Sequence, residues 1–389
     1  MRYGLAVWAV GLVVALALQH AVAAEPPGAA RPVGVSRASI ASQPPSASPA
    51  PSASPSQSAS EPPGGPVPAV ASADTYTIPD ADLSQPPVFV VYGDMRFTDP
   101  AETTAAAPGP RRALVEKVAS EHPDALFLTG DIPWHGGDPD DYQEYSEETA
   151  TWQKQHLRVY PVLGNHEFSD CAQAKCLENW WHAFPQFQGR RWYAVALGSQ
   201  IRVLALDSNA SLLPGSVQRQ WLEEQMAALP KTLRFVFLTL HHPPVADQGF
   251  LIVRSNERSL RDYLTSLSRK SSVRFVVCSG HVHNYERFER DGVFYLVSGG
   301  GGAKPLRVHR GFADKYRASG FPNFHYIRFE LQADRLEAQM VRLTDYKADM
   351  PHTWAIKDRF EIPARQAPTD AAAPASRPPQ PAPRAARQR

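Results

Sequence analysis

Five short apolar runs in this sequence each stop at a side chain that can bind a metal ion. The runs are rich in branched aliphatic and aromatic residues, which predicts buried β-strands. Apolar residues between them have helical spacing, as at Leu114, Val115 and Val118, so the pattern is that of an α/β sheet. The residues that follow the runs are Asp94, Asp131, Asn165, His241, and His281 with His283. Because functional groups collect at the carboxyl ends of such strands, we expect these side chains to meet.

Prolines mark the limits of the foldable part of the chain. The sequence has 389 residues and 37 prolines, close to twice the usual share of about 5%. They cluster between Pro26 and Pro68 and between Pro368 and Pro383, in stretches without the periodic apolar residues that bury a core. We therefore predict a disordered Pro/Ala/Ser-rich linker at 25–73, one domain at 74–363 and a disordered Pro/Ala/Arg-rich tail at 364–389.

The first 24 residues have the organisation of a signal peptide. Arg2 precedes an apolar run from Leu5 to Leu18, and small residues occupy positions 21–24. An uncleaved membrane anchor is the alternative, but the run is short for a span of about 20 residues. The small residues favour cleavage, after Ala24 or Ala23. We predict a periplasmic or secreted protein with no transmembrane segment in the mature chain.

Charge and cysteine content exclude two classes of protein. The formal net charge of +1 lacks the basic excess of a nucleic-acid binder, so we expect no specific binding of nucleic acid. The three cysteines lack the paired spacing of a structural zinc site. In an oxidising compartment, Cys171 and Cys176 are expected to form a disulfide in a polar loop. Cys278 lies in an apolar run and is expected to be a buried free thiol.

The donor types in the strand-end set favour a metal centre. Two carboxylates, one amide oxygen and three imidazoles suit zinc, manganese, iron or cobalt, and the histidines argue against calcium. Six side chains exceed what one tetrahedral zinc uses. Two metal ions that share a carboxylate fit better, and such a pair can stabilise both the attacking and the leaving oxygen of a phosphoryl transfer.

The motifs at these positions identify a family. GD, GD, GNHE, HHP and GHVHNYER occur in that order, each after an apolar strand. Between about Val88 and Leu343 the sequence resembles the calcineurin-like metallophosphoesterase superfamily, and within it the purple acid phosphatase branch and its bacterial relatives. The resemblance implies a four-layer αββα sandwich, in which two mixed β-sheets are flanked by helices around a dinuclear metal centre.

The resemblance also assigns a role to each motif residue. It implies that Asp94 and His283 bind the first metal and that Asp131 bridges both metals. Asn165, His241 and His281 would complete the second metal. His166 matches the histidine beside the leaving group, which it would either protonate or stabilise electrostatically. The nucleophile implied by the family is a metal-bound hydroxide that attacks phosphorus in line.

Two positions depart from the family pattern. The purple enzymes have a metal-binding tyrosine three residues after the bridging aspartate, where this chain has Trp134. Other branches have a histidine two residues after the first aspartate, where this chain has Arg96. Water, His135 or a side chain from another segment could fill the gap at the first metal. Arg96 either binds a phosphate oxygen, as a guanidinium is suited to do, or pairs with one of the acids between Asp138 and Asp141.

Several neighbours of the motifs are expected to lie outside the donor set. We expect His241 rather than His242 to be the ligand. Glu167 and Glu286 either orient ligand loops or form local ion pairs, for example Glu286 with Arg287. Asp207 is expected to be structural. The aromatic side chains near Trp180 are expected to pack in the core or a lid rather than to form a substrate platform.

These observations predict an exported phosphoesterase that depends on two metal ions (Fe, Zn or Mn). The substrate would be a phosphorylated small molecule or a nucleotide-type compound, most of all a phosphomonoester. A phosphodiesterase with the same chemistry is one alternative. The other is a metal-binding pseudoenzyme, or an envelope protein that recognises phosphate groups without hydrolysing them.

Overall fold

A computed structural model describes residues 75–247, 252–318, 320–347 and 351–365. The predicted signal peptide at 1–24, the linker at 25–73 and nearly all of the tail lie outside the described residues. Just after the predicted domain end at Pro363, Ala364 N donates to Asp334 O and Arg365 Nη1 donates to Ser271 O. Within the described ranges, no helix has the length and apolar character needed to cross a bilayer.

The larger of two β-sheets has seven strands. In order across the sheet these are β1 (Thr75–Ile78), β5 (Tyr193–Leu197), β6 (Ile201–Ala205), β7 (Phe235–Thr239), β8 (Arg274–Ser279), β10 (Val293–Ser298) and β9 (Tyr285–Arg290). The central strands β6, β7, β8 and β10 run parallel to one another. β5 is antiparallel to β6, and β9 is antiparallel to β10. The sheet is therefore mixed, with a parallel centre.

The second sheet has six strands. Their order is β13 (Trp354–Pro363), β12 (Arg335–Leu343), β11 (His325–Leu331), β2 (Val88–Tyr92), β3 (Ala125–Leu128) and β4 (Val159–Pro161). β2, β3 and β4 are parallel, whereas β11, β12 and β13 add to β2 in antiparallel fashion. The two sheets pack against each other through aromatic side chains, with the ring of Phe237 5.2 Å from those of Phe89 and Phe329.

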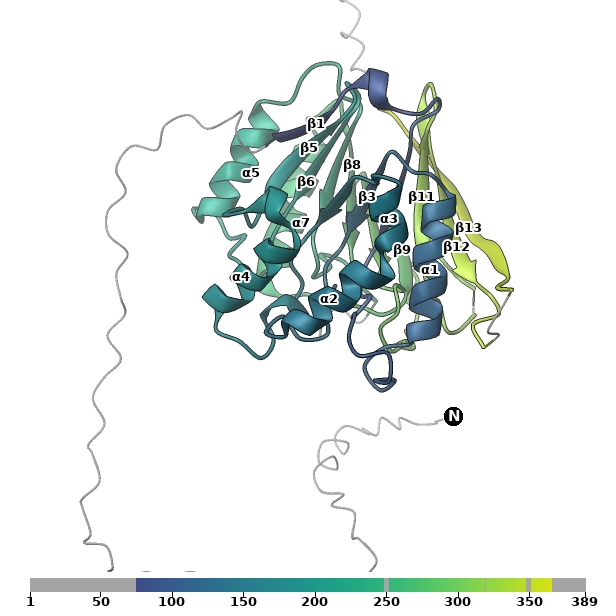
Figure 1. Cartoon of the computed structure of the whole chain (residues 1–389). Coiled ribbons are helices and arrows are strands. Elements are labelled where there is room, and N and C mark those ends of the chain that lie inside the picture. The colour runs from purple at the N-terminus through teal and green to yellow at the C-terminus, as the bar shows by residue number, and fades with distance from the viewer. Residues whose placement is uncertain (1–74, 248–251, 319, 348–350, 366–389) are drawn as a thin grey trace, which may run out of the picture. The chain divides into compact units, whose positions relative to one another are not determined.

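Helices cover the outer face of each sheet (Figure 1). On the six-stranded sheet lie α1 (Pro108–Ser120) and α3 (Ala150–Lys154), with α2 (Pro139–Glu148) next to α3, and on the seven-stranded sheet lie α5 (Val217–Ala227) and α7 (Ser255–Ser268). α4 (Gln173–Ala183) follows the 3-10 turn η2 (His166–Phe168), and the turns η1 (Asp80–Asp82) and η3 (Pro185–Phe187) complete the described elements. The predicted four-layer sandwich is confirmed.

Alternation along β7 shows how one strand serves two layers. Phe235 and Phe237 belong to the core between the sheets, whereas Val236 and Leu238 pack with Leu260 of α7 in a second core. Successive side chains of a strand point to opposite faces of the sheet, so a strand buried on both faces reads as a continuous apolar run. That is why the central strands were predictable.

Some elements differ from the sequence prediction. Residues 139–154 form two helices, α2 and α3, which meet at Thr149, whose Oγ1 donates to Tyr145 O at 2.6 Å. Ser216 caps the N-terminus of α5, since its side chain accepts from Arg219 N. β1, β9, β13 and α4 were not predicted. Cys176, expected in a loop, lies in α4, and the structure joins it to Cys171 by a disulfide with the Cα atoms 5.6 Å apart.

The parallel strands of both sheets direct their carboxyl ends to one region. β2 and β3 lead to Asp94 and Asp131, and β7 and β8 lead to His241 and His281. Backbone hydrogen bonds hold these loops together: Asp94 N donates to Gly130 O at 2.9 Å, and Gly280 N donates to His241 O at 3.0 Å. The fold therefore brings together residues that are far apart in the sequence.

Candidate metal centre

Asp131 occupies the middle of the strand-end cluster. Its side chain is fully buried. Oδ1 lies 3.2 Å from Nε2 of His241 and accepts a hydrogen bond from the backbone N of His166 at 3.0 Å. Oδ2 lies 3.4 Å from Nη2 of Arg96. The two carboxylate oxygens thus face different groups, which is the arrangement needed in a carboxylate that bridges two sites.

Three further donors converge beside Asp131. Oδ1 of Asn165 lies 3.0 Å from Nε2 of His241 and 3.0 Å from Nδ1 of His281, and the two ring nitrogens are 3.2 Å apart. Together with Asp131, these residues are the set expected for the second metal. We call them the second donor group.

Asp94 and His283 lie on the other side of the cluster. Nε2 of His283 is 3.6 Å from Oδ1 of Asp94, and the backbone N of His281 donates to the Asp94 carboxylate at 2.9 Å. Asp94, His283 and the shared Asp131 form the first donor group. Ligand atoms of Asp94, Asp131 and His241 all lie within 4.8 Å of one another, so the two groups are contiguous.

Backbone carbonyls fix the tautomers of two imidazoles. Nδ1 of His241 donates to Thr129 O at 2.9 Å, and Nδ1 of His283 donates to Lys304 O at 2.8 Å. The lone pair of each ring is therefore on Nε2, the atom that faces the carboxylates. Such an outer hydrogen bond is usual for a metal-binding histidine because it fixes the ring orientation and raises its basicity.

Burial sets the protonation states of the cluster. It lowers the pKa of His281 to about 3, with His241 contributing, and that of His283 to about 4, with Arg96 contributing. Burial opposes ionisation of Asp131, but His241, His166 and Arg96 outweigh it and bring the pKa to about 2. Neutral imidazoles and an ionised carboxylate are the forms that bind metals. The donor set therefore fits two ions of the borderline type.

Two glycines are required by close approach of the loops. Gly130 has φ +86°, and a Cβ there would lie 2.6 Å from Gly164 N. A Cβ on Gly164 would lie 2.3 Å from Oδ1 of Asp131. Side chains at these positions would separate the loops that carry Asp131 and Asn165, which explains glycine before each of them.

Glu167 holds the loops of the cluster from behind. Its buried carboxylate accepts hydrogen bonds from the backbone N atoms of Asp131 (3.0 Å), Ile132 (2.9 Å) and Gly164 (2.7 Å). This favours the interpretation of Glu167 as a loop-orienting residue. Burial and the nearby Asp131 raise its pKa to about 8.

Glu286 does not form the ion pair with Arg287 that was considered for it. Its Oε2 accepts from Asp247 N at 2.6 Å, and Arg287 pairs with Asp358 at 2.7 Å. The local Glu286–Arg287 ion pair was therefore wrong, because successive residues of β9 point to opposite faces of the sheet.

A stack of three side chains forms one wall of the centre. The ring of His166 lies parallel to that of Trp134, with centroids 4.6 Å apart, and the guanidinium of Arg96 lies 4.7 Å from the Trp134 ring. Nδ1 of His166 donates to Trp134 O at 2.7 Å, which leaves Nε2 3.8 Å from Oδ2 of Asp131. Trp134 therefore orients His166 and Arg96 toward the cluster.

Two hypotheses about the positions that depart from the family pattern are not supported. His135 points to acids outside the cluster, with its ring nitrogens 3.4 Å from Asp141 and 3.6 Å from Asp170, so it is not placed as a substitute ligand. Arg96 pairs with Asp131 rather than with the acids at 138–141.

Residues that sequence reasoning treated as peripheral support the centre. His242 lies beside His281, with ring centroids 4.5 Å apart, and its Nδ1 is 2.8 Å from Ser208 Oγ. Asp207 forms a buried ion pair with Arg191, in agreement with a structural role. Asn209 donates to Gly164 O at 3.0 Å and so ties this loop to the one that carries Asn165. The one feature of the sequence that marks these contacts is the run Asp207-Ser208-Asn209, which follows an apolar strand.

Comparison with known proteins gives the class of this molecule. Residues 86–285, just over half of the chain, match the model of the calcineurin-like phosphoesterases. The chain belongs to this family, as its motifs predicted. A search of the curated proteins finds no match.

Solved structures of the same fold are distant in sequence. Purple acid phosphatase PPD1 from yellow lupin seeds has a TM-score of 0.58 at 16% identity, over 74% of this chain and 55% of the lupin chain. GAP50, the anchor in the inner membrane complex of Plasmodium, has a TM-score of 0.53 at 14% identity, over 73% of this chain and 90% of its own. The chain thus spans about half of the lupin enzyme, and these similarities concern the fold alone.

Proposed function

We propose that this chain is an exported hydrolase of phosphate esters, most of all phosphomonoesters, that works with two metal ions. The observation that carries the proposal is the convergence of donor atoms from Asp131, Asn165, His241 and His281 at 3.0–3.2 Å, next to Asp94 and His283. Export is supported by the organisation of residues 1–24 and by the Cys171–Cys176 disulfide, since disulfides persist in oxidising compartments.

The first and second donor groups would hold the metal ions. When bound, such ions supply Lewis acidity and lower the pKa of water. Asp131 belongs to both groups and would help to hold both ions. Burial and the charge of Asp131 raise the pKa of Asp94, and a cation beside Asp94 would favour the ionised form that binds a metal. The identity of the metals, among iron, zinc and manganese, is part of the test below.

His166 is proposed to assist the leaving group. Its Nδ1 proton is fixed on Trp134 O, so the proton that it exchanges is the one on Nε2, the atom that faces the cluster. Burial lowers the pKa of His166, and the charge of Asp131 partly opposes this. Stacking on Trp134 limits rotation of the ring, so the proton is delivered from one direction.

Arg96 is proposed to bind the phosphoryl group. One of its nitrogens lies near Asp131, and its guanidinium plane is held against Trp134. Its Nε is buried without a hydrogen-bond partner among the described residues, so donor capacity remains. A planar guanidinium can donate two parallel hydrogen bonds to phosphate oxygens. The Arg96 guanidinium would thus face the substrate from a position where other branches of the family have a metal ligand.

Hydrolysis of a chromogenic phosphomonoester and of the matching diester tests the proposal. The full chain is assayed after loading with Fe, Zn or Mn, and its metal content is measured. Turnover that prefers the monoester and is lost in Asp131→Asn supports the proposal, whereas faster diester turnover assigns the diesterase alternative. No turnover of either ester by protein that holds two metal ions would contradict it.

One observation favours a second candidate function. The fold also resembles that of GAP50, which is described as an anchor, and the first donor group contains only three side chains with Arg96 beside them. A protein that binds phosphate groups without hydrolysing them would keep these features. Catalytic loss on His166→Ala separates the two functions, because a binding protein needs no general acid.

A further inference from the structure

Among the described residues, Arg111 has the largest fully buried charged side chain. It lies in the first turn of α1, and the hydrolysis proposed above makes no use of it. A guanidinium has five N–H donors and stays ionised when buried. Its neighbours must therefore supply both hydrogen-bond acceptors and a negative charge, and the position of those acceptors shows what the arginine holds in place.

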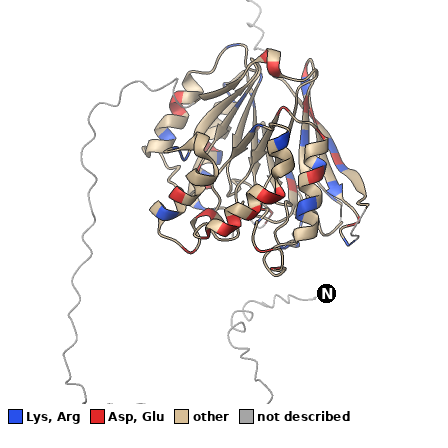
Figure 2. Cartoon of the chain, viewed as in Figure 1, with Lys and Arg blue, Asp and Glu red and all other residues tan. Residues whose placement is uncertain are grey.

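Glu148, the last residue of α2, balances the charge of Arg111. Nε and Nη2 of Arg111 donate to the two carboxylate oxygens of Glu148 at 2.8 and 2.7 Å, which is the bidentate geometry typical of a strong arginine–carboxylate pair. Acidic residues gather along α2, and basic residues lie on α1 (Figure 2). The buried pair thus joins the start of one helix to the end of the other.

A third contact of Arg111 is with the backbone of Arg96. Nη1 of Arg111 donates to Arg96 O at 2.8 Å. The guanidinium of Arg111 also lies 4.8 Å from the ring of Phe97, the next residue in the chain. The buried arginine of α1 therefore reaches the loop that carries the cation beside Asp131.

Backbone hydrogen bonds of this loop leave the carbonyl of Arg96 to Arg111. Arg96 N donates to Asp131 O at 3.0 Å, and Phe97 N donates to Ile132 O at 2.7 Å, so both amides pair with the segment that follows β3. Arg96 has φ +51°, a conformation that persists in a non-glycine residue only where the surroundings impose it. Because Arg111 is buried, its bond to the Arg96 carbonyl is shielded from water, where a missing donor is costly.

Gly302 makes room for Arg111 at the start of α1. A Cβ on Gly302 would lie 2.8 Å from Cβ of Arg111, and Gly302 has φ +146°. The carbonyl of Gly302 accepts from Ala107 N at 2.7 Å, and the next residue, Ala303, donates its N–H to Asp94 O at 2.7 Å. The first turn of α1 is therefore fixed against the loop that follows β2, and Arg111 with it.

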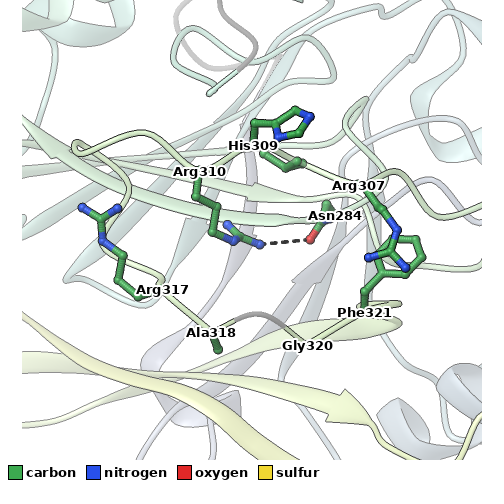
Figure 3. Close-up of a pocket in the computed structure, with 9 residues that line it drawn as sticks. Asn284, Arg307, His309, Arg310, Arg317, Ala318, Gly320 and Phe321 are labelled. Atoms are coloured by element: carbon green, nitrogen blue, oxygen red, sulfur yellow. Dashed lines mark hydrogen bonds between the residues drawn. The ribbon is translucent and has the colours of Figure 1, made fainter.

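Arg310 shows that a well-paired arginine need not hold this loop. Its guanidinium is directed toward Asn284 in a pocket of about 320 Å³ (Figure 3). Arg310 pairs with Asp314, and it donates to Tyr285 O at 2.8 Å and to Asn284 Oδ1 at 3.2 Å. These contacts join the start of β9 to the segment that follows β10. The hydrogen bond to Arg96 is what sets Arg111 apart.

We propose that Arg111 is a positioning residue for phosphate binding. Together with Glu148, it holds the backbone of Arg96 and so keeps the guanidinium of Arg96 directed at the donor cluster. Because Arg111 is fully buried, it acts through Arg96 and does not touch the substrate. The effect on phosphate rests on the proposed function, in which Arg96 binds the phosphoryl group, whereas the hold on the loop does not.

Arg111→Met/Glu148→Leu removes the hold without leaving a buried charge. Exchange of a buried ion pair for apolar side chains of similar size is often neutral for stability, and both new residues are good helix formers. Arg219→Met/Glu223→Leu is the matched control. Arg219 in α5 is also buried, pairs with Glu223 at 2.8 Å and donates to a backbone carbonyl, Leu212 O, but α5 covers the other sheet (Figure 1).

Titration of the metal-loaded full chain with inorganic phosphate tests the effect on binding, with metal content measured on the same samples. Arg111→Met/Glu148→Leu should bind phosphate about tenfold more weakly than the wild type, as Arg96→Ala should. Since both changes act through one guanidinium, their combination should bind less than about twofold more weakly than Arg96→Ala alone. The control should bind as the wild type does. Unchanged binding in Arg111→Met/Glu148→Leu, or independent losses that add up in the combination, overturns the proposal.

Hydrogen exchange tests the hold on the loop and needs neither metal nor turnover. The amides of Arg96 and Phe97 should exchange at least about tenfold faster in Arg111→Met/Glu148→Leu than in the wild type, while the amides of β7 keep their protection. Equal protection of the two loop amides, or a loss that extends to β7, overturns the positioning role. If the wild type hydrolyses no phosphate ester, or if Arg96→Ala binds phosphate normally, the proposed function has failed in that respect, and hydrogen exchange still decides about Arg111.

Discussion

The guanidinium Nη2 of Arg96 lies 3.4 Å from Oδ2 of Asp131, the carboxylate at the centre of the donor cluster. Arg96 has φ +51°, a left-handed backbone conformation that non-glycine residues rarely adopt. The side chain is therefore held at the first donor group by the fold. A permanent cation thus stands beside the carboxylate that the two donor groups share.

Arg96→Ala is expected to weaken substrate binding more than metal binding. Loss of the guanidinium removes a bidentate partner for phosphate, so KM for a phosphomonoester should rise about tenfold. Metal content, measured on the same preparations, should be retained, because removal of a cation beside Asp131 does not remove a ligand.

Arg112→Ala is the matched control for this variant. Its side chain is half exposed and pairs with Glu148, away from the centre, so its KM should equal that of the wild type. Kinetics of Arg96→Ala that match the wild type would exclude Arg96 from phosphate binding. Loss of metal from Arg96→Ala would instead show that the arginine stabilises the donor cluster.

The iron-loaded protein is expected to lack a tyrosinate-to-iron charge-transfer band. Trp134 occupies the position of the family's tyrosine, and an indole NH is a donor without a lone pair to offer a metal. Its ring is also used in stacking on His166. Visible absorption of the ferric protein is the measurement. Trp134→Tyr is the comparison that would gain the band if the position alone determines it. An intense band in the wild type that disappears on changing a tyrosine contradicts the prediction.

The donor set was predictable because each member lies at the end of its own strand. Short motifs report which side chain follows a buried apolar run, and parallel strands bring those ends together. Asp94, Asn165 and His281 could therefore be placed in one cluster without knowledge of their contacts. The family resemblance then assigned the roles, and the structure brings the donor atoms together.

The supporting contacts were not predictable because they join distant residues. Thr129 O fixes the tautomer of His241 across 112 residues, and no local pattern marks a backbone carbonyl for this task. β13 was missed for a different reason. Half of its side chains are exposed, and only Phe360 and Ile362 are buried, so its apolar pattern is too weak to indicate a strand.

Glu167→Gln is expected to destabilise the protein and weaken metal binding. Both carboxylate oxygens accept backbone N–H groups, and the amide NH₂ of glutamine cannot accept. At least one buried N–H would lose its partner, at a cost of roughly 1–3 kcal/mol. Thermal unfolding and metal titration measure the two effects. Glu178→Gln, at an exposed position, is the control and should resemble the wild type. A stable Glu167→Gln variant with normal metal affinity would show that the clamp is dispensable.

Glu286→Gln is expected to stabilise the protein at alkaline pH. Burial, with Asp247 and Asp314 contributing, raises the pKa of Glu286 to about 8, and its Oε1 has no hydrogen-bond partner among the described residues. A raised carboxyl pKa means that the folded state favours the protonated form. The wild type therefore loses stability as the pH rises from the unfolded value of about 4.5 through 8. Glutamine does not ionise, so the variant should unfold at a similar temperature near pH 5 and be more stable by roughly 1–3 kcal/mol near pH 9. Thermal unfolding across this range is the measurement, with exposed Glu289→Gln as the control. A stability difference that is independent of pH would show that Glu286 is ionised in the folded protein at all these pH values.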